Sequence, residues 1–377
     1  MKRVVLLMHG GLAPPGSARN VPALAGLVRR LSHQFDITVY TLQGAEAAPG
    51  PFVHGRAVVR YVPVRLGAHM SVKILRMIRA VLSDHRRNPY SLIHGFWALP
   101  GGCSGVAAGK LANIPSVVSL LGGEAACLPG IDYGNMRKTG PRAATLWSCR
   151  TANALTALTW YQLHQLSRFG FDRQAGVHVI PFGAEAPFFS AGEQRPAGPP
   201  FHLLHVGDMN RVKDQVTLLK AFRLIREQMD CRLRIVGEDT LGGEVQRYAE
   251  RLGISDAVTF AGFVPHDSLA PHFAWAHVLL HTSLYEGQGV VFAEAAAAGL
   301  PICGTRVGLL SDLGADFAVT VEAGNHDGLA GAALTLLGDM PFRERLAAGA
   351  KAWALEHDAD HTATRVADVY GSLLNRE

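Results

Sequence analysis

Two glutamates bracket a glycine-containing loop in the segment Leu284–Thr305, LYEGQGVVFAEAAAAGLPICGT. The apolar run 278–280 precedes the segment and predicts a strand, and the alanine-rich stretch that ends at Gly299 and Pro301 predicts a short helix. A strand, a glycine loop and a helix N-terminus together make an anion site. The reason is that the N–H groups of the first helical turn have no partner within the helix, and the helix dipole favours negative charge.

Glu286 lies on the loop side of this turn, and Glu294 lies about one turn inside the predicted helix. Both carboxylates can accept hydrogen bonds from vicinal hydroxyls, so a ligand with phosphate between two hydroxyl-bearing groups fits, as in a sugar–diphosphate–ribose. The alternative is an ordinary strand–loop–helix unit with both carboxylates in solvent. In a glycosidase, the two carboxylates would lie on either side of a scissile bond. Two glutamates that flank a phosphate-binding helix start fit ligand binding better than this arrangement.

The Glu-x7-Glu spacing, followed by small residues and Gly-x-Pro, resembles the signature of the family-four retaining glycosyltransferases. That family also has a strand, Gly, Arg, four further residues and Lys before a helix. In HVGDMNRVKDQVTLLKAF (205–222), Lys213 matches the lysine, Asp208 stands where the arginine is usual, and Arg211 is a candidate substitute. The resemblance implies that Lys213 and Arg211 hold a donor diphosphate, whose charge their cationic heads offset.

The resemblance further implies that Glu294 holds the ribose hydroxyls and Glu286 the transferred sugar, with the diphosphate on the N–H groups from Gly289 to Val291. The complete set of implied donor-binding residues is Arg211, Lys213, Glu286, Gly287, Gly289, Val290, Val291, Glu294, Phe263 and Gly16. The implied catalytic residues are Glu286, Lys213 and Glu124.

Two of these residues belong to motifs of the first half. Gly16 lies in Pro14-Pro15-Gly16-Ser17, which resembles a Gly-Gly loop that closes on the phosphates, although Ser17 is also a plausible helix N-cap. Glu124 lies in LLGGEA (120–125), which corresponds to the family's His-Gly-x-Asp/Glu, with Leu121 at the usual histidine position.

The chain as a whole alternates strand-like and helix-like segments, which predicts an α/β fold with parallel strands and right-handed crossovers. With 377 residues, two domains are expected. The resemblance implies the GT-B architecture, two Rossmann-like doubly wound domains that face across a cleft. We predict an acceptor domain over residues 1–185, a linker rich in proline and glycine over 186–200, and a donor domain over 201–361. The last helix, about 362–377, is predicted to pack back on the first domain.

Charge is unevenly distributed. Residues 1–190 contain 20 lysines and arginines and 7 aspartates and glutamates, whereas residues 191–377 contain 16 and 24. A basic first half suggests an anionic acceptor or surface, and no nucleic-acid motif accompanies the charge. The helix predicted from Ser71 to Arg87 combines an apolar stripe with Lys73, Arg76 and Arg79, so it either lies on an anionic membrane or packs one face in the core.

Five scattered cysteines without a CxxC pair argue for reduced thiols and against a zinc site. Met1, Lys2 and Arg3 precede a short apolar VVLLM, too short for a secretory signal, and no apolar run reaches about 18 residues. The sequence therefore predicts a cytoplasmic protein that is peripheral at the inner membrane face if the basic helix binds lipid. The run His357–His361 contains Asp-x-Asp but lies between predicted surface helices, so we expect no metal.

Together these features predict a retaining glycosyltransferase that needs no cofactor and moves a sugar from a nucleotide-sugar donor to a hydroxyl of a saccharide, glycan or lipid-linked acceptor. One alternative is a nucleotide-sugar epimerase on the same architecture. The other is a catalytically silent sugar-nucleotide binder, which Asp208 and Leu121 motivate.

Overall fold

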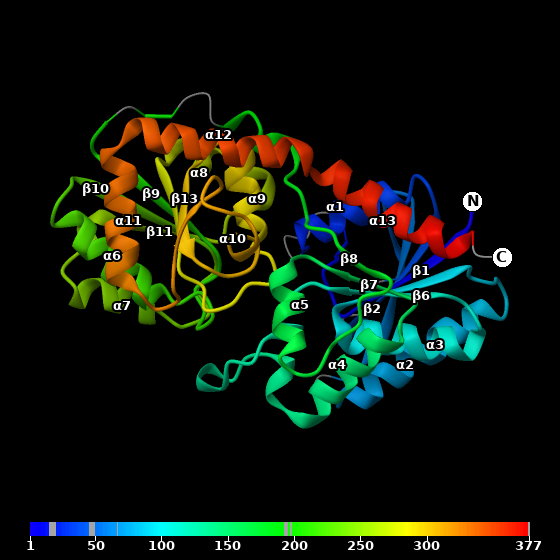
Figure 1. Ribbon diagram of the computed structural model, residues 1–377. Helices are drawn as coiled ribbons and strands as arrows, with labels where there is room; N and C mark the ends of the chain where they lie inside the picture. The colour runs from blue at the N-terminus through cyan, green and yellow to red at the C-terminus, as the bar shows by residue number, and fades with distance from the viewer. Residues whose placement is uncertain (15–19, 45–49, 66, 192–194, 197, 376–377) are drawn as a thin grey trace. The chain divides into compact units, whose positions relative to one another are not determined.

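The computed structural model describes residues 1–14, 20–44, 50–65, 67–191, 195–196 and 198–375. The chain divides into two compact units, residues 1–181 with 359–377 and residues 182–358 (Figure 1). Each unit is built on its own sheet, and all strand pairs but one are parallel. The predicted α/β class with two doubly wound domains is confirmed.

The first unit has an eight-stranded sheet with the order β3-β4-β2-β1-β5-β6-β7-β8, in which only β3 and β4 pair antiparallel. Its strands are β1 (Arg3–Met8), β2 (Asp36–Gly44), β3 (Phe52–His54), β4 (Ala57–Val64), β5 (Leu92–Phe96), β6 (Ser116–Leu120), β7 (Ala154–Ala157) and β8 (Val177–Val179). The centre of the sheet is apolar on both faces, as expected for parallel strands covered by helices: residues 4–8 of β1 are fully buried. Strand order reverses at β1, whose neighbours are β2 and β5, so the edge beyond its carboxyl end is the ligand-binding position of a doubly wound sheet.

Helices cover both faces of this sheet. They are α1 (Pro22–Leu31), α2 (Met70–His85), α3 (Cys103–Ala112), α4 (Thr139–Thr151), α5 (Trp160–Ser167) and α13 (Ala359–Leu374). Helix α1 packs against α13, and α2 packs against α3 on the other face (Figure 1).

The second unit has a six-stranded, all-parallel sheet with the order β11-β10-β9-β12-β13-β14. Its strands are β9 (Phe201–Val206), β10 (Cys231–Val236), β11 (Val258–Gly262), β12 (Val278–His281), β13 (Ile302–Thr305) and β14 (Val319–Val321). Its helices are α6 (Gln215–Arg226), α7 (Glu244–Arg251), α8 (Ala270–Trp275), α9 (Val290–Ala297), α10 (Leu309–Asp312), α11 (His326–Gly338) and α12 (Met340–Glu356). One buried cluster lies between the sheet and α6, α7 and α11, and a second lies between the sheet and α8, α9 and α12.

The boundary between the units differs from the prediction. The segment 186–200 was expected to be a linker, but the second unit begins at Phe182, whose backbone N–H and C=O both bond to the Gln288 side chain, at 2.8 and 2.7 Å. Phe188 is 1% exposed within the core of the same unit. Proline and glycine mark this segment as irregular backbone, but irregular backbone still packs when it carries large apolar side chains.

Helix α13 belongs to the first unit and is attached there by polar contacts as well as apolar ones. The buried Tyr370 hydroxyl shares a 2.6 Å hydrogen bond with His94 Nδ1 of β5, and the Tyr370 ring packs edge-on against Phe35. Thr362 Oγ1 donates to the Pro181 carbonyl at 2.8 Å. The helix therefore completes one face of the first unit although it is the last element of the chain.

Helix α2 buries Met77 and Val81, whereas Val72 and Leu75 are 42% and 47% exposed. Arg76 and Arg79 are exposed beside them, so the outer surface of this helix mixes apolar and cationic side chains. Among the residues described, no helix has the length and apolar character needed to cross a bilayer.

Candidate active site

The loops after β9 and β10 lie in direct backbone contact at the carboxyl edge of the second unit's sheet. A Cβ on Gly237 would lie 2.2 Å from the Gly207 carbonyl oxygen, so only glycine fits there. Asp208 Oδ1 accepts the N–H of Glu238 at 2.8 Å and ties the two loops together. The residue at the usual arginine position is therefore a loop anchor in this chain.

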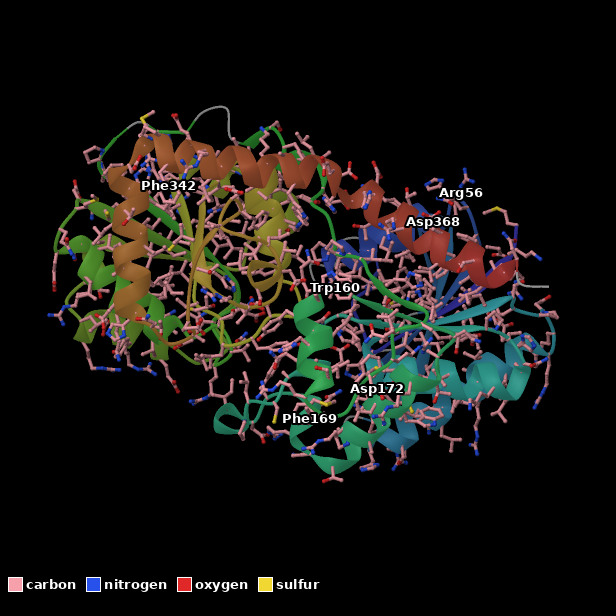
Figure 2. All side chains as sticks on the ribbon, in the orientation of Figure 1. Arg56, Trp160, Phe169, Asp172, Phe342 and Asp368 are labelled. Carbon is pink, nitrogen blue, oxygen red and sulfur yellow. The ribbon has the colours of Figure 1, made fainter. Side chains whose placement is uncertain are left out.

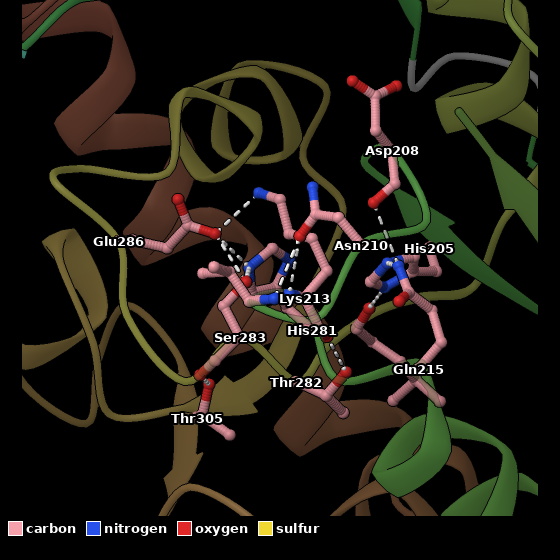
Figure 3. A network of polar contacts seen from close by, with 12 residues as sticks. His205, Asp208, Asn210, Lys213, Gln215, His281, Thr282, Ser283, Glu286 and Thr305 are labelled. Atoms are coloured by element: carbon pink, nitrogen blue, oxygen red, sulfur yellow. Dashed lines mark hydrogen bonds and ion pairs between the residues drawn. The ribbon is translucent and has the colours of Figure 1, made fainter. Parts of the chain in front are cut away.

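A compact polar network lies at the same edge, where the loop after β9 meets the loop after β12 (Figure 3). Lys213 Nζ donates to Glu286 Oε1 at 2.7 Å, and Ser283 Oγ donates to the same oxygen at 2.5 Å. His281 Nε2 lies 3.0 Å from that oxygen and 2.7 Å from Ser283 Oγ. Three side chains from two loops thus converge on one carboxylate oxygen.

Backbone contacts fix the positions of these loops. Thr282 Oγ1 donates to the Lys213 carbonyl at 2.8 Å, and Asn210 Oδ1 accepts the N–H groups of Val212 and Lys213 at 3.1 Å each. Thr305 Oγ1, at the end of β13, donates to the Ser283 carbonyl at 2.7 Å. The Lys213–Glu286 pair is therefore held by three neighbouring strands, β9, β12 and β13.

The environment of this pair sets its protonation. Burial alone would raise the pKa of Glu286, but the Lys213 charge and the His281 hydrogen bond outweigh it and lower that pKa far below its usual value. Burial lowers the pKa of His281, so its ring is neutral at pH 7 and donates through Nε2. Glu286 is therefore an ionised acceptor inside a largely buried site, with a side chain only 13% exposed.

Helix α9 begins at Gly289, whose φ of +78° is left-handed and whose missing Cβ leaves room for the Phe292 ring. Glu294 lies in this helix, is 6% exposed, and contacts His266 Nε2 at 2.8 Å through Oε1. Burial alone would lower the pKa of His266, yet the hydrogen bond and charge of Glu294 outweigh it and raise that pKa. The sequence gives no signal for His266, because it lies 28 positions before Glu294 and belongs to no recognised motif.

The other predicted donor residues divide into three groups. Gly287, Val290 and Val291 lie with Gly289 at the start of α9, on the edge that carries Glu286. Phe263 follows β11 and is 51% exposed, and Arg211 is exposed on the loop that carries Lys213. Gly16 lies outside the described residues.

Glu124 lies in the first unit, 3% exposed, in the loop after β6. Its carboxylate accepts the N–H groups of Leu121 at 3.1 Å, Gly122 at 2.6 Å and Ala98 at 3.4 Å. Burial raises its pKa although these N–H groups act in the opposite direction. Glu124 thus holds the loops after β5 and β6 together, and its predicted catalytic role stays a prediction.

Trp97 is a further candidate site residue, which no motif in the sequence marks. It directly follows β5, at the edge where strand order reverses, and its φ of +58° is rare for a bulky residue. Its ring lies between two glycines, since a Cβ on Gly11 would meet Cη2 at 3.4 Å and one on Gly122 would meet Nε1 at 3.6 Å. A strained backbone at the carboxyl edge of a parallel sheet is typical of a functional side chain. In the sequence, the sole hint of this strain is the Pro-Gly-Gly that follows Trp97 at 100–102.

Further polar and aromatic side chains lie at the same edge of the first unit. Trp160 starts α5 just past the end of β7 and is 62% exposed (Figure 2). Burial, and then the nearby charge of Lys73 from α2, lower the pKa of His9 just past β1. Lys73 is therefore close enough to His9 to act on it electrostatically, whereas Arg76 and Arg79 are exposed.

No cluster of three or more histidine, cysteine, aspartate or glutamate side chains suited to a metal ion occurs within the described residues.

Comparisons with known proteins cover both units. Residues 16–183 match the family described as "Glycosyl transferase 4-like domain", and residues 200–339 match "Glycosyl transferases group 1". The chain is similar to the D-inositol 3-phosphate glycosyltransferase of Nocardiopsis dassonvillei, with 28% identity over 358 residues, 86% of this chain and 81% of the relative.

Two solved structures show the fold of the whole chain. The sucrose-phosphate synthase of Thermosynechococcus elongatus is 17% identical, with a TM-score of 0.82 and full coverage of both chains. HepE of Anabaena, solved with UDP and glucose, is 18% identical with a TM-score of 0.75 and covers 99% of this chain and 100% of that one. The chain therefore belongs to the group 1 glycosyltransferases and has the GT-B fold.

Proposed function

We propose that this glycosyltransferase takes its sugar from a nucleotide-sugar donor bound at the carboxyl edge of the second unit's sheet. The observation that carries the proposal is the largely buried Lys213–Glu286 network, together with the start of α9 that follows Glu286 in the chain. It combines a cation and the N–H groups at the start of α9 for phosphate with an ionised acceptor for hydroxyls. HepE, solved with UDP and glucose, supports a donor of this kind.

The residues at this edge would bind different parts of the donor. Lys213, with Arg211 from the same loop, and the N–H groups from Gly289 to Val291 hold the diphosphate. Glu286 accepts hydroxyls of the transferred sugar, because Lys213, His281 and Ser283 keep it ionised and fixed. Glu294 accepts the ribose hydroxyls and shares its carboxylate with His266.

The proposed transfer proceeds with retention at the anomeric carbon. The bond from that carbon to the leaving phosphate oxygen breaks, and the acceptor hydroxyl oxygen forms the new bond on the same face. The hydroxyl proton passes to the leaving phosphate. Because Lys213 and the α9 N–H groups stabilise the developing charge, we expect activity to persist in EDTA, and activity that returns only with manganese or magnesium would contradict this.

We propose that the acceptor binds the first unit and carries an anionic group. The excess of lysine and arginine in residues 1–190 supports this, as does Lys73 beside His9 at the strand ends. Trp97 offers a flat apolar ring to a cyclic polyol at the same edge. The similar protein of Nocardiopsis dassonvillei is named for a phosphorylated inositol, which is an acceptor of this class.

A lipid-linked acceptor would also place the protein at a membrane, and the outer surface of α2 fits this use. Val72, Leu75, Arg76 and Arg79 are all exposed on this helix, and each cation near an anionic leaflet contributes about 1 kcal/mol. Liposome sedimentation tests it. Wild type should bind anionic but not neutral vesicles, less so in high salt, and an Arg76→Ser/Arg79→Ser variant should lose binding. Equal sedimentation of wild type and variant would show that the basic side of α2 faces solvent and does not bind lipid.

The central experiment is product analysis with a panel of nucleotide sugars and phosphorylated or lipid-linked polyols. A glycosylated acceptor with retained anomeric configuration supports the proposal, and an inverted product contradicts the retaining mechanism. A changed sugar that stays on the nucleotide would instead indicate an epimerase. Nucleotide binding without any product across the panel would favour the silent binder that Asp208 and Leu121 motivated.

A further inference from the structure

A cavity with two arginines in its wall lies in the second unit, at the edge of the sheet opposite to the proposed donor residues. Its volume is about 310 Å³. His277 and Pro301 line it and directly precede β12 and β13, whereas Glu286 follows the end of β12. Arg343 of α12 and Arg195 complete the polar wall. The cavity is therefore separated from the Lys213–Glu286 network by the length of the strands.

The two arginines are fixed in place by helix ends. Arg195 Nη1 and Nη2 donate to the carbonyls of Gly299 and Ala298, just past the end of α9, at 2.8 and 3.1 Å. Arg343 Nη1 donates to the carbonyls of Leu336 and Leu337 in the last turn of α11, at 3.2 and 3.1 Å. Such carbonyls favour a nearby cation, so both guanidinium groups are pre-oriented on neighbouring walls of one cavity.

Their donors are only partly used. Arg195 Nε is buried and has no hydrogen-bond partner among the described residues, which costs free energy until an acceptor supplies one. Burial and, to a smaller extent, the positive charge of Arg343 together lower the pKa of Arg195 to about 10. The two cations therefore repel each other, and an anion bound between them would relieve that repulsion.

The remaining wall residues limit the chemistry of the ligand. His277 is neutral here, because its pKa is lowered to about 4, mainly by burial. Its Nδ1 accepts the N–H of His202 at 2.9 Å, which also requires an unprotonated Nδ1. Glu344 contributes one opposing carboxylate, and Met340 contributes an exposed apolar wall. Planar guanidinium groups match the oxygens of a phosphate, and the apolar wall matches a small organic group attached to it.

We propose that this cavity is a second ligand site of the protein and binds a small phosphate monoester between Arg195 and Arg343. The proposal does not depend on the donor or the acceptor of the transfer reaction. A ligand bound there would join Arg195 to the first turn of α12.

Calorimetry with glycerol 3-phosphate, and with glycerol as the uncharged control, tests the site. Wild type should bind the ester and not glycerol, with the same affinity whether or not saturating UDP is present. Arg343→Gln should weaken binding about tenfold or more, since it removes a charged donor. Glu344→Gln should strengthen it about two- to fivefold, since it removes an opposing charge near the surface.

Arg251→Gln, an exposed substitution on α7, is the matched control and should change nothing. Circular dichroism identifies any variant that has lost its fold, and Glu344→Gln gives a gain that misfolding cannot imitate. The proposal is overturned if UDP abolishes binding of the ester, because the ester then occupies the donor edge. Unchanged binding by Arg343→Gln, or weaker binding by Glu344→Gln, would overturn it equally. If UDP itself fails to bind, the donor proposal fails while the arginine variants still decide this one.

Discussion

At the scale of single residues, both glutamates of the Glu-x7-Glu segment already have protein partners, and the two partners differ in kind. Glu286 pairs with a lysine and two neutral donors, whereas Glu294 pairs with a histidine. A histidine is released more easily than a lysine when a ligand competes for the carboxylate. Glu294 is thus the carboxylate better suited to exchange partners with an incoming hydroxyl.

The first prediction concerns that exchange. Glu294→Ala should weaken UDP binding by about 1.5–3 kcal/mol, as expected for hydrogen bonds to a charged group. Isothermal calorimetry measures it, and Glu322→Ala, on an exposed loop of the same unit, is the control. Unchanged UDP affinity in a folded Glu294→Ala protein would remove Glu294 from the site.

The second prediction uses the raised pKa of His266. A histidine whose pKa is higher in the folded state stabilises that state fully below its unfolded pKa of about 6.5, and this contribution disappears as pH rises through the folded value. Urea unfolding of wild type should therefore show stability that declines over this window. His266→Asn should flatten the decline, and a steeper decline in the variant would contradict the assignment.

The third prediction concerns the buried ion pair. Lys213→Ala leaves the largely buried Glu286 ionised without its cation and should lower the free energy of unfolding by about 1–3 kcal/mol. Adding Glu286→Gln to that variant should recover part of the loss, because no charge then remains unpaired. A double-mutant cycle by urea unfolding gives the coupling, and additive single effects would show that the pair is not coupled.

At the scale of elements, a strand can be predicted from the sequence where apolar residues run continuously, as in β1. The sequence gives no such signal for β7 (Ala154–Ala157), whose alanines and threonine lack a clear apolar run, or for the short β3 (Phe52–His54). It also placed the linker within a packed segment. The sequence could bring Lys213, Glu286 and Glu294 to attention because their motifs are local in the chain. The contacts of His266, Trp97 and Asp208 join strand ends that are distant in the sequence, so no local pattern marks them.

The attachment of α13 gives the fourth prediction. Tyr370→Phe removes the hydroxyl bonded to His94 and leaves His94 Nδ1 buried without a partner, which should lower the free energy of unfolding by about 1–3 kcal/mol. Tyr61→Phe is the control in the same unit, since the Tyr61 hydroxyl has no hydrogen bond within the described part of the chain. Equal unfolding curves for the two variants would mean that packing alone holds α13.

At the scale of the whole molecule, the two units differ in how the chain builds them. The second is one continuous segment, residues 182–358, and both of its apolar clusters draw only on that segment. The first needs both ends of the chain, because α13 supplies the fully buried Tyr370. The second unit should therefore fold by itself, whereas residues 1–181 should need α13 for full stability.

The last prediction follows from this difference. A fragment of residues 182–358 should fold cooperatively, because its apolar core lies within this segment. It should also bind UDP, because the proposed donor residues Lys213, Glu286 and Glu294 are part of it. A fragment of residues 1–181 should be less stable than the first unit in the full chain, because it lacks α13 and leaves His94 without Tyr370. Circular dichroism with thermal unfolding compares the two fragments, and calorimetry measures UDP binding. A fragment 182–358 that folds but ignores UDP would place essential donor contacts in the first unit, whereas a fragment that stays unfolded would show that the second core depends on the first.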